Sequence, residues 1–442
     1  MNWEEKYRYR ISEDEVMDED KIGQFLVLHQ SEVSNRFKPL LNAYVTDYPI
    51  LHEAVKEKWK PDNRIAVNFA KYITDTMSGF FIGNPIKVTC ESDDVADYVE
   101  LLRRYSGQDG IDAELAKMCS IYGKAYEMYF VDENSNIGIT YLSPINAFMI
   151  YGDSLLKPVR YFVHTYKDVD NVVRGSVSDE ETVRYFEIKG KLQFVGEAKQ
   201  HGFDGVPATK FTENEEETGI FEPALSMINA YNKAISEKAN DVDYFADAYL
   251  KVLGEELDDD DIKHIRDNRI INFGGDSDRL VVEFLEKPNG DTTQENLINR
   301  LERLIFNISM VANISDENFG TSSGIALKYK LLAMTNLAKT KERKFKAGME
   351  RRYRLIFSNA LSKVKSDSWL KLGYIFTPNI PENILEETEI AGNLEGIVSK
   401  STQLQTLSIV DNVQAEIKKI EAENKESDPV INQLFGGGSD DE

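Results

Sequence analysis

The clearest hydrophobic pattern in the chain lies in two segments, 291–313 and about 324–365, which flank a polar loop. The first segment has an apolar residue at alternating spacings of four and three, which is typical of a helix with one apolar seam. The seam consists of Leu297, Leu301, Leu304, Ile308 and Val311, and Ile298, Ile305 and Ala312 widen it into a face. The second segment keeps an apolar stripe without proline for about forty residues, or ~60 Å at ~1.5 Å per residue. The two segments therefore predict a helical hairpin.

Further helices are predicted wherever apolar residues recur at helical spacing between glycine, proline or polar turn formers. These segments are 19–44, with Pro39 disturbing its end, 64–81, 93–105, 110–122, 223–250 and 383–425. Residues 1–17 are polar and are expected to be loosely held, and 46–63 are expected to form a loop. The chain is therefore predicted to be rich in helix at both ends.

Residues 124–211 have a different texture, because short β-rich runs alternate there with Gly, Asn, Asp and Pro turns. We interpret this block as a mostly antiparallel sheet region. In the small insert 251–290, residues 253–270 are compatible with a helix, and strands are predicted at 270–273 and 280–286. Short strands are also predicted at 86–90 and within 371–383. The fold class that follows is α+β.

Length and charge limit the kind of molecule that this chain can be. Its 442 residues are enough for two or three domains or one elongated subunit, and 41% hydrophobic residues supply real cores. The net charge is −24, so the overall field repels phosphate backbones. If the protein meets DNA, it must do so through a local patch or by surrounding it.

The N-terminus and the cysteines indicate where the protein works. Cys90 and Cys119 are too far apart in sequence for a CxxC motif, and this composition is typical of a reduced, intracellular protein. The N-terminus has no apolar signal region, and the chain has no apolar run of eighteen residues. We therefore expect a protein that is neither secreted through a signal peptide nor inserted in a membrane.

Catalytic motifs are scarce. The five histidines are scattered, and the sequence contains no P-loop and no kinase signature. The acidic run 255–261 is the best candidate for a Mg²⁺ or Ca²⁺ site, but consecutive carboxylates on a helix point in different directions. A solvated helix N-terminus is the favoured interpretation of that run. We therefore expect no ATP hydrolysis, no cofactor, no metal and no enzyme activity.

A basic stretch in the second long helix stands out in so acidic a chain. Between residues 339 and 354 eight bases face two acids. The bases are Lys339, Lys341, Arg343, Lys344, Lys346, Arg351, Arg352 and Arg354. They either pair with acidic groups of this chain or a neighbouring subunit, which we favour, or they contact phosphates.

The order of these parts resembles a known family. Residues 63–86, 122–153 and 314–331 resemble, in turn, the N-terminal helix and turn, the wing strands, and the channel loop with its following helix in portal proteins of tailed bacteriophages. The likeness is greatest to the family typified by the portal of Bacillus phage SPP1, and it covers about residues 20–420. The order and spacing of the three stretches together carry the resemblance.

The resemblance implies an elongated subunit of a ring, usually of twelve copies, with long stem and wing helices, a β-rich wing, a small α/β clip and a helical crown. By position, the parts are the wing region (1–222), first stem helix (223–250), clip (251–290), second stem helix (291–313), tunnel loop (314–323), long wing helix and strand (324–382), crown (383–425) and a flexible acidic tail (426–442). The tunnel loop is implied to approach DNA through Ser315, Asp316, Glu317, Asn318, Phe319, Gly320, Thr321 and Ser322.

The function implied is a channel at the capsid vertex for packaging and ejecting double-stranded DNA, without sequence specificity. Implied partners are the terminase large subunit, the head–tail adaptor, and the scaffolding and major capsid proteins, with no membrane. The protein would be assembled in the host cytoplasm and reside in the virion. Two other hypotheses remain: a metal-dependent nucleic-acid enzyme using the carboxylates of 255–261, and a cytoplasmic helical scaffold protein that forms dimers.

Overall fold

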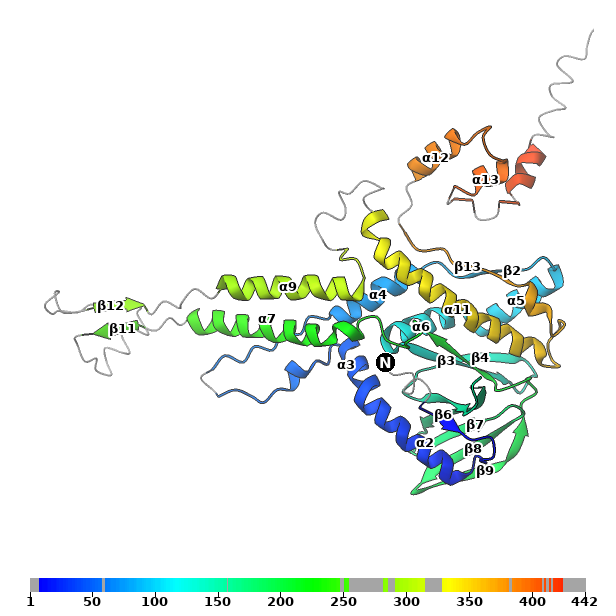
Figure 1. The fold of residues 1–442 in the computed structure, drawn as a ribbon, viewed down its shortest axis with the longest axis horizontal. Coiled ribbons are helices and arrows are strands. Elements are labelled where there is room, and N and C mark those ends of the chain that lie inside the picture. Colours follow the sequence, from blue (N-terminus) through cyan, green and yellow to red (C-terminus); the bar gives the residue numbers. More distant parts are fainter. Residues whose placement is uncertain are drawn as a thin grey trace, which may run out of the picture. The chain divides into compact units, whose positions relative to one another are not determined.

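The computed structural model describes residues 8–57, 60–156, 158–246, 250–253, 281–284, 291–314, 328–380, 384–407, 409–410, 413–414 and 416–423. The chain divides into two compact units (Figure 1). The first comprises 1–321 and 328–378, and the second comprises 322–327 and 379–442. Each unit is described by itself.

The N-terminal helix of the first unit is continuous but changes its winding. Helix α2 (Glu19–Glu32) passes through a π-helical turn (Val33–Phe37) into α3 (Lys38–Tyr44). This confirms the helix predicted over 19–44. Pro39 lies in the first turn of α3, where the N–H that proline lacks is not needed for a helical hydrogen bond. The irregular helical hydrogen bonding is found in the π-helical turn directly before it.

Residues 8–17, the described part of the segment 1–17, are not loosely held, contrary to expectation. Strand β1 (Arg10–Ile11) pairs in parallel with β5 (Ala147–Gly152), and Tyr9, Ile11 and Met17 are buried. They join Ile22 and Phe25 of α2 in one apolar core under the sheet. The sequence prediction failed because three apolar residues in a polar segment carry no periodicity.

The predicted β-rich block forms two sheets, and every pairing within 124–212 is antiparallel, as expected. The larger sheet has the order β1-β5-β6-β7-β8-β9, with β6 (Val159–Lys167), β7 (Val173–Ser178), β8 (Thr182–Lys189) and β9 (Lys191–Gln200). The smaller sheet has the order β10-β3-β4, with β10 (Ala208–Thr212), β3 (Lys124–Val131) and β4 (Ile137–Leu142). α2 packs along the larger sheet, and α11 contacts β10 of the smaller one (Figure 1).

Three predicted helices are present: α4 (Phe69–Ile82), α5 (Asp93–Ser106) and α6 (Gln108–Tyr122). α5 and α6 lie close to their expected bounds, but the helix predicted over 64–81 begins only at Phe69, because residues 63–67 are extended and bond the side chains of α7. Gly107, at φ +62°, makes the sharp turn between α5 and α6. Strand β2 (Lys87–Thr89) pairs with β13 (Gly373–Ile375), so both short predicted strands exist and belong to one ladder.

Helix α11 (Leu332–Ser358) is shorter than predicted. It ends at Ser358 and not near Lys365, because Asn359 adopts an extended conformation (φ −71°, ψ 135°). The Asn359 side chain accepts a hydrogen bond from the Leu361 amide at 2.9 Å, which replaces helical pairing. A 3₁₀ turn (Ser368–Lys371) follows and packs on α11. The expected start at Gly324 lies outside the described residues.

Helices α7 (Leu225–Ala246) and α9 (Asp291–Ser309) confirm the helices predicted over 223–250 and 291–313, and they lie side by side (Figure 1). Among the described elements the main partner of α9 is therefore α7, and not α11 as the hairpin predicted from 291–313 and 324–365 required. Strand β11 (Leu250–Leu253) replaces the end of the helix predicted to reach residue 250, and it pairs antiparallel with β12 (Val281–Phe284). The strand predicted at 280–286 is thus confirmed. The candidate helix at 253–270 and the strand at 270–273 lie outside the described residues, apart from Leu253 itself.

The second unit contains α12 (Ile384–Asn393) and α13 (Lys400–Leu404). The Gln403 amide donates to the Ala391 carbonyl at 2.7 Å, which ties the two helices together. Gly396, at φ +75°, lies in the turn between them, so the region predicted as helical over 383–425 is interrupted there. The predicted acidic tail, 426–442, lies outside the described residues.

Candidate functional site

The α7–α9 pair packs on α4 through aromatic rings at one end, and polar contacts farther along join the two helices to each other. Phe306 of α9 meets Phe69 and Tyr72 of α4 edge-on, with ring centroids 5.7 Å apart in both pairs. Lys238 forms an ion pair with Glu295, and the Gln294 amide donates to Asp241 at 2.8 Å. These contacts align the two helices along their length.

An extended segment, residues 63–67, lies along α7 and is held by a ladder of three hydrogen bonds. The amides of Asn63, Ile65 and Val67 donate to the side chains of Asn240, Ser236 and Asn232 at 2.6, 2.9 and 2.9 Å. The acceptors recur every four residues on one helical face, and the donors recur every second residue of an extended chain. We call residues 45–67 the arm.

The arm and α9 lie on opposite sides of α7. At about 100° per residue, Lys238 and Asp241, which contact α9, are roughly 200° and 140° around the helix from Ser236, which contacts the arm. The sequence predicted only a loop for most of this arm, because a backbone ladder to helix side chains leaves no periodic signal. Asn232, Ser236 and Asn240 at spacings of four were the available sign.

All eight predicted tunnel-loop residues, Ser315, Asp316, Glu317, Asn318, Phe319, Gly320, Thr321 and Ser322, lie outside the described residues. The chain before them is anchored, because the Ile314 amide donates to the Tyr72 hydroxyl at 2.9 Å. Beside this anchor is a groove of about 620 Å³ between α9 and the residues that lead into α11, with Arg303, Asn307 and Lys330 in its lining.

The eight predicted bases of α11 do not form one surface. Lys341 and Arg352 are fully buried within the subunit. Lys341 bonds Glu213 and Ser120, both at 2.7 Å, and Arg352 bonds Asp112 at 2.5 Å and Glu127 at 2.8 Å. These two side chains are therefore removed from the set of inter-subunit or phosphate contacts. Their partners are acids of their own chain.

Burial and charge act in opposite directions on this internal cluster. Burial by itself lowers the pKa of Arg352, but the carboxylates of Asp112 and Glu127 hold that pKa well above its ordinary value. Burial raises the pKa of Glu127, and Arg352 opposes that rise. Lys341 and Arg352 continue the helical spacing of the apolar residues Ala338, Phe345 and Ile356, and this spacing was the sequence signal that they face inward.

Three other bases are engaged at the surface. Arg351 donates to the carbonyls of Ala208 and Val206 at 3.2 and 3.4 Å, Lys344 pairs with Glu215, and Lys339 pairs with Glu342 at 2.8 Å. Arg343, Lys346 and Arg354 are exposed. With Lys339 they lie at positions i, i+4, i+7 and i+15 of one helical face, so the exposed basic stripe comprises Lys339, Arg343, Lys346 and Arg354.

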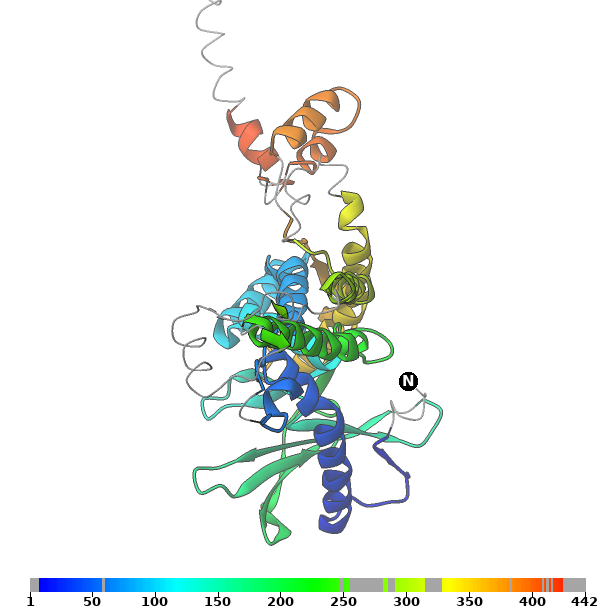
Figure 2. The ribbon, with the colours of Figure 1, turned by 90° about the vertical axis from the view of Figure 1, so that its left-hand side faces the viewer.

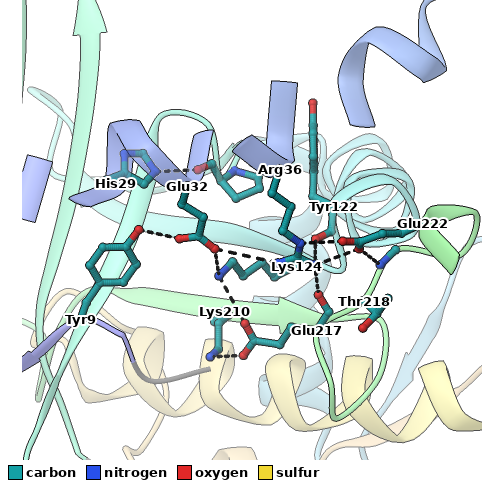
Figure 3. A network of polar contacts seen from close by, with 12 residues as sticks. Tyr9, His29, Glu32, Arg36, Tyr122, Lys124, Lys210, Glu217, Thr218 and Glu222 are labelled. Atoms are coloured by element: carbon teal, nitrogen blue, oxygen red, sulfur yellow. Dashed lines mark hydrogen bonds and ion pairs between the residues drawn. The ribbon is translucent and has the colours of Figure 1, made fainter. Parts of the chain in front are cut away.

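A second charged cluster joins the first helix to the sheets and was not found from the sequence (Figure 3). Glu32 of α2 accepts from the Tyr9 hydroxyl at 2.5 Å and pairs with Lys124 at 3.3 Å. Lys124 also pairs with Glu217 at 3.4 Å, and Glu217 bonds Lys210 of β10 at 2.6 Å. Glu217 lies in the acidic run 213–217, and neither the spacing nor the composition of that run marks its residues as buried.

Arg36 completes this cluster. Its guanidinium bonds Glu222 at 2.7 Å and donates to the carbonyls of Glu217 and Tyr122 at 2.6 and 3.3 Å. Burial opposes the charge on Arg36, but Glu222 and Glu32 raise its pKa. Burial likewise opposes the charge on Glu32, but Lys124, Tyr9 and Arg36 lower its pKa. The cluster therefore ties the first residue of β3, Lys124, and the middle of β10, Lys210, to the N-terminal helix.

Within the described part of the chain, no three His, Cys, Asp or Glu side chains are grouped to hold a metal ion. The carboxylates of 255–261 lie outside that part. None of the helices that the structure describes is long and apolar enough to span a membrane. The features that stand out in the described residues are thus a helical hairpin, an arm, the anchored Ile314 and two charged clusters.

These features define a structural subunit, and comparison with known proteins identifies its class. Residues 25–430 match the family of SPP1 Gp6-like phage portal proteins, and the chain belongs to this family. It is 22% identical over 398 residues to the portal protein of Clostridium phage phiCD119, covering 82% of this chain and 85% of that one. It is 24% identical over 429 residues to the portal protein of Bacillus phage SPP1, covering 90% of this chain and 83% of that one.

A solved structure, the neck of an empty GTA particle, is also similar, with a TM-score of 0.47, 12% identity, and coverage of 76% of this chain and 88% of that chain. Family membership identifies the protein as a virion component of the portal class. Portal proteins are non-enzymatic and form a ring-shaped DNA channel at the capsid vertex.

Proposed function

We propose that twelve copies of this chain close into a ring through which double-stranded DNA is packaged into the capsid and later ejected. The observation that carries the proposal is the family match over residues 25–430, which includes the α7–α9 hairpin. Two antiparallel helices held along their length are suited to form the wall of a channel, because neighbouring copies add further helices beside them. α7 and α9 would be the two stem helices.

The terminase large subunit would dock on the clip during packaging, and the head–tail adaptor would occupy the same region afterwards. Support comes from the β11–β12 ladder, in which Leu250 pairs with Phe284 and Leu253 with Val281. This ladder joins the distal ends of the stem helices, so the clip would be a separate docking element. The wing and the crown, 383–425, would contact the scaffolding and major capsid proteins during assembly in the host cytoplasm.

The loop Ser315–Ser322 would meet DNA in the channel without reading its sequence. Its polar side chains suit backbone contacts, and the net charge of −24 keeps the channel from gripping the phosphates. Phe319 would be the one bulky side chain of the loop to contact DNA, and Gly320 would let the chain turn directly after it. The exposed basic stripe Lys339, Arg343, Lys346 and Arg354 would pair with acids of a neighbouring subunit or contact phosphates.

Native mass spectrometry of the purified chain, with negative-stain images of the same sample, tests the ring. A closed ring of about a dozen copies is expected. A stable dimer that never closes would exclude the portal function and favour a scaffold protein. Replacing Phe319 and shortening the loop should then impair packaging while rings still form, and full packaging by such rings would exclude the DNA-contacting loop.

A further inference from the structure

Three of the five residues in the apolar seam predicted for 291–313, Leu297, Leu304 and Ile308, remain exposed in the subunit. Helix α9 contacts the rest of the first unit through Ile298, Ile305 and Ser309, which are buried. Leu297, Leu304 and Ile308 each precede one of these residues, so they lie about 100° around the helix. They are 51%, 36% and 47% exposed. We call these three residues the α9 ridge.

A second set of exposed apolar side chains lies on the other side of α7, on the arm. Val45, Val55 and Ile65 are exposed, and Val55 is the most so, at 83%. The ladder to Asn232, Ser236 and Asn240 fixes residues 63–67 of this arm opposite α9. One subunit thus carries two separate apolar surfaces, on opposite sides of the same helix.

The two surfaces also lie at matching levels along α7. Glu295, two residues before Leu297, pairs with Lys238, and Ile65 bonds Ser236 two residues away on the same helix. Farther along, Asn68 donates to the Tyr44 carbonyl at 2.8 Å, and the ring of Phe69 contacts that of Phe306. Leu297 is therefore level with Ile65, and Val45 is level with the stretch between Leu304 and Ile308.

We propose that the α9 ridge of one subunit packs on the exposed apolar residues of the arm, Val45, Val55 and Ile65, of the next subunit in the ring. The proposal rests on the proposed ring. A cyclic ring requires a heterologous contact, in which one surface meets a different surface of an identical copy. Two apolar surfaces at the same level on opposite sides of one helix meet that requirement. Pairing them would remove from water the large apolar side chains that a single copy leaves exposed.

The first experiment places the photo-crosslinking residue p-benzoylphenylalanine at Leu304 in the full chain and irradiates purified rings. Covalent dimers are expected, with the adduct mapped by mass spectrometry to residues 42–67 of the second copy. Rings that give no covalent dimer, or dimers linked to another segment, would overturn the pairing. If the unmodified chain forms no ring at all, the proposed function fails first, and the inference fails with it.

The second experiment replaces the ridge by serine, Leu297→Ser, Leu304→Ser and Ile308→Ser together. Because these side chains are exposed in the subunit, circular dichroism of the variant should match that of the parent, while native mass spectrometry should show monomer in place of ring. The control, Asn299→Ser, changes an exposed residue on the opposite flank of α9 and should keep the ring. A folded triple variant that closes rings as readily as the parent would refute the proposal.

Discussion

Arg352 donates from Nε to Glu127 at 2.8 Å in a place where both side chains are excluded from solvent. Arg352 comes from α11 and Glu127 from β3, and Asp112 of α6 accepts from the other side of the guanidinium at 2.5 Å. One buried cation therefore joins a helix, a strand and a second helix. It holds the long helix α11 onto the smaller sheet.

Removing Arg352 should strongly destabilise the subunit. Arg352→Met leaves Glu127 and Asp112 buried without their cation, which typically costs about 3–5 kcal/mol of unfolding free energy. Denaturant unfolding monitored by circular dichroism measures this loss. Arg354→Met is the matched control, because Arg354 is exposed on the same helix and its replacement should change stability by less than about 0.5 kcal/mol. Equal effects of the two variants would refute a role for the buried pair.

The Glu32 cluster predicts a stability loss in acid. The pKa of Glu32 is lower in the folded chain than its ordinary value of 4.5, so the unfolded state binds more protons than the folded state between the two values. The contribution of Glu32 is thus complete above about 4.5 and disappears as the pH falls toward the folded pKa. As the pH is lowered from neutral, the urea concentration at the midpoint of unfolding should fall less steeply for Glu32→Gln than for the parent. Glu13→Gln, at an exposed site, should keep the parent's slope.

Opening of the arm should become easier when one step of its ladder is removed. Ser236→Ala takes away the acceptor of the Ile65 amide, at an expected cost of about 1 kcal/mol, or roughly fivefold faster local opening. Hydrogen exchange of a peptide covering residues 60–68 measures this directly. Ser226→Ala, an exposed serine of the same helix, should leave the exchange rate unchanged. Unaltered exchange in Ser236→Ala would show that the ladder does not hold the arm.

Substitution by alanine should have opposite effects on stability at two glycines, Gly110 within α6 and Gly123 at its C-terminal end. Gly123 has φ +84°, and a Cβ there would meet the Glu217 carbonyl oxygen at 1.9 Å, so Gly123→Ala should cost at least about 2 kcal/mol. Gly110 lies within α6 with no atom within 4 Å of its would-be Cβ. Gly110→Ala should therefore raise stability by about 0.5–1 kcal/mol. Thermal unfolding of both variants checks the contrast.

The exposed basic stripe should act between subunits more than on DNA, because the rest of the chain supplies an excess of acids. Replacing Lys339, Arg343, Lys346 and Arg354 by Gln should make rings dissociate at lower salt, while the salt dependence of DNA binding keeps its slope. Native mass spectrometry over a salt series and a parallel DNA titration separate these effects. A reduced DNA slope with unchanged rings would assign the stripe to phosphate contacts.

The helices, the antiparallel block and the β12 strand were predictable from the sequence, because their signals are local. Leu297, Leu301 and Leu304 repeat at helical spacing whether or not anything packs on them. The resemblance to the portal family could also be recognised from the sequence, because it rests on the order of segments along the chain. Helix ends were mispredicted where a side chain bonds the backbone, as at Asn359.

Tertiary structure alone decided which of these patterns is used and where. Lys341 and Arg352 belong to a basic run whose partners the sequence left open. In the structure they are buried in ion pairs with Glu213, Asp112 and Glu127, which lie more than a hundred residues away in sequence. The seam of α9 looked like a core stripe, yet α7 contacts the neighbouring face and leaves Leu297 exposed. The physical reason is that periodicity records which side of an element is apolar, whereas the partner of that side depends on contacts between segments distant in sequence.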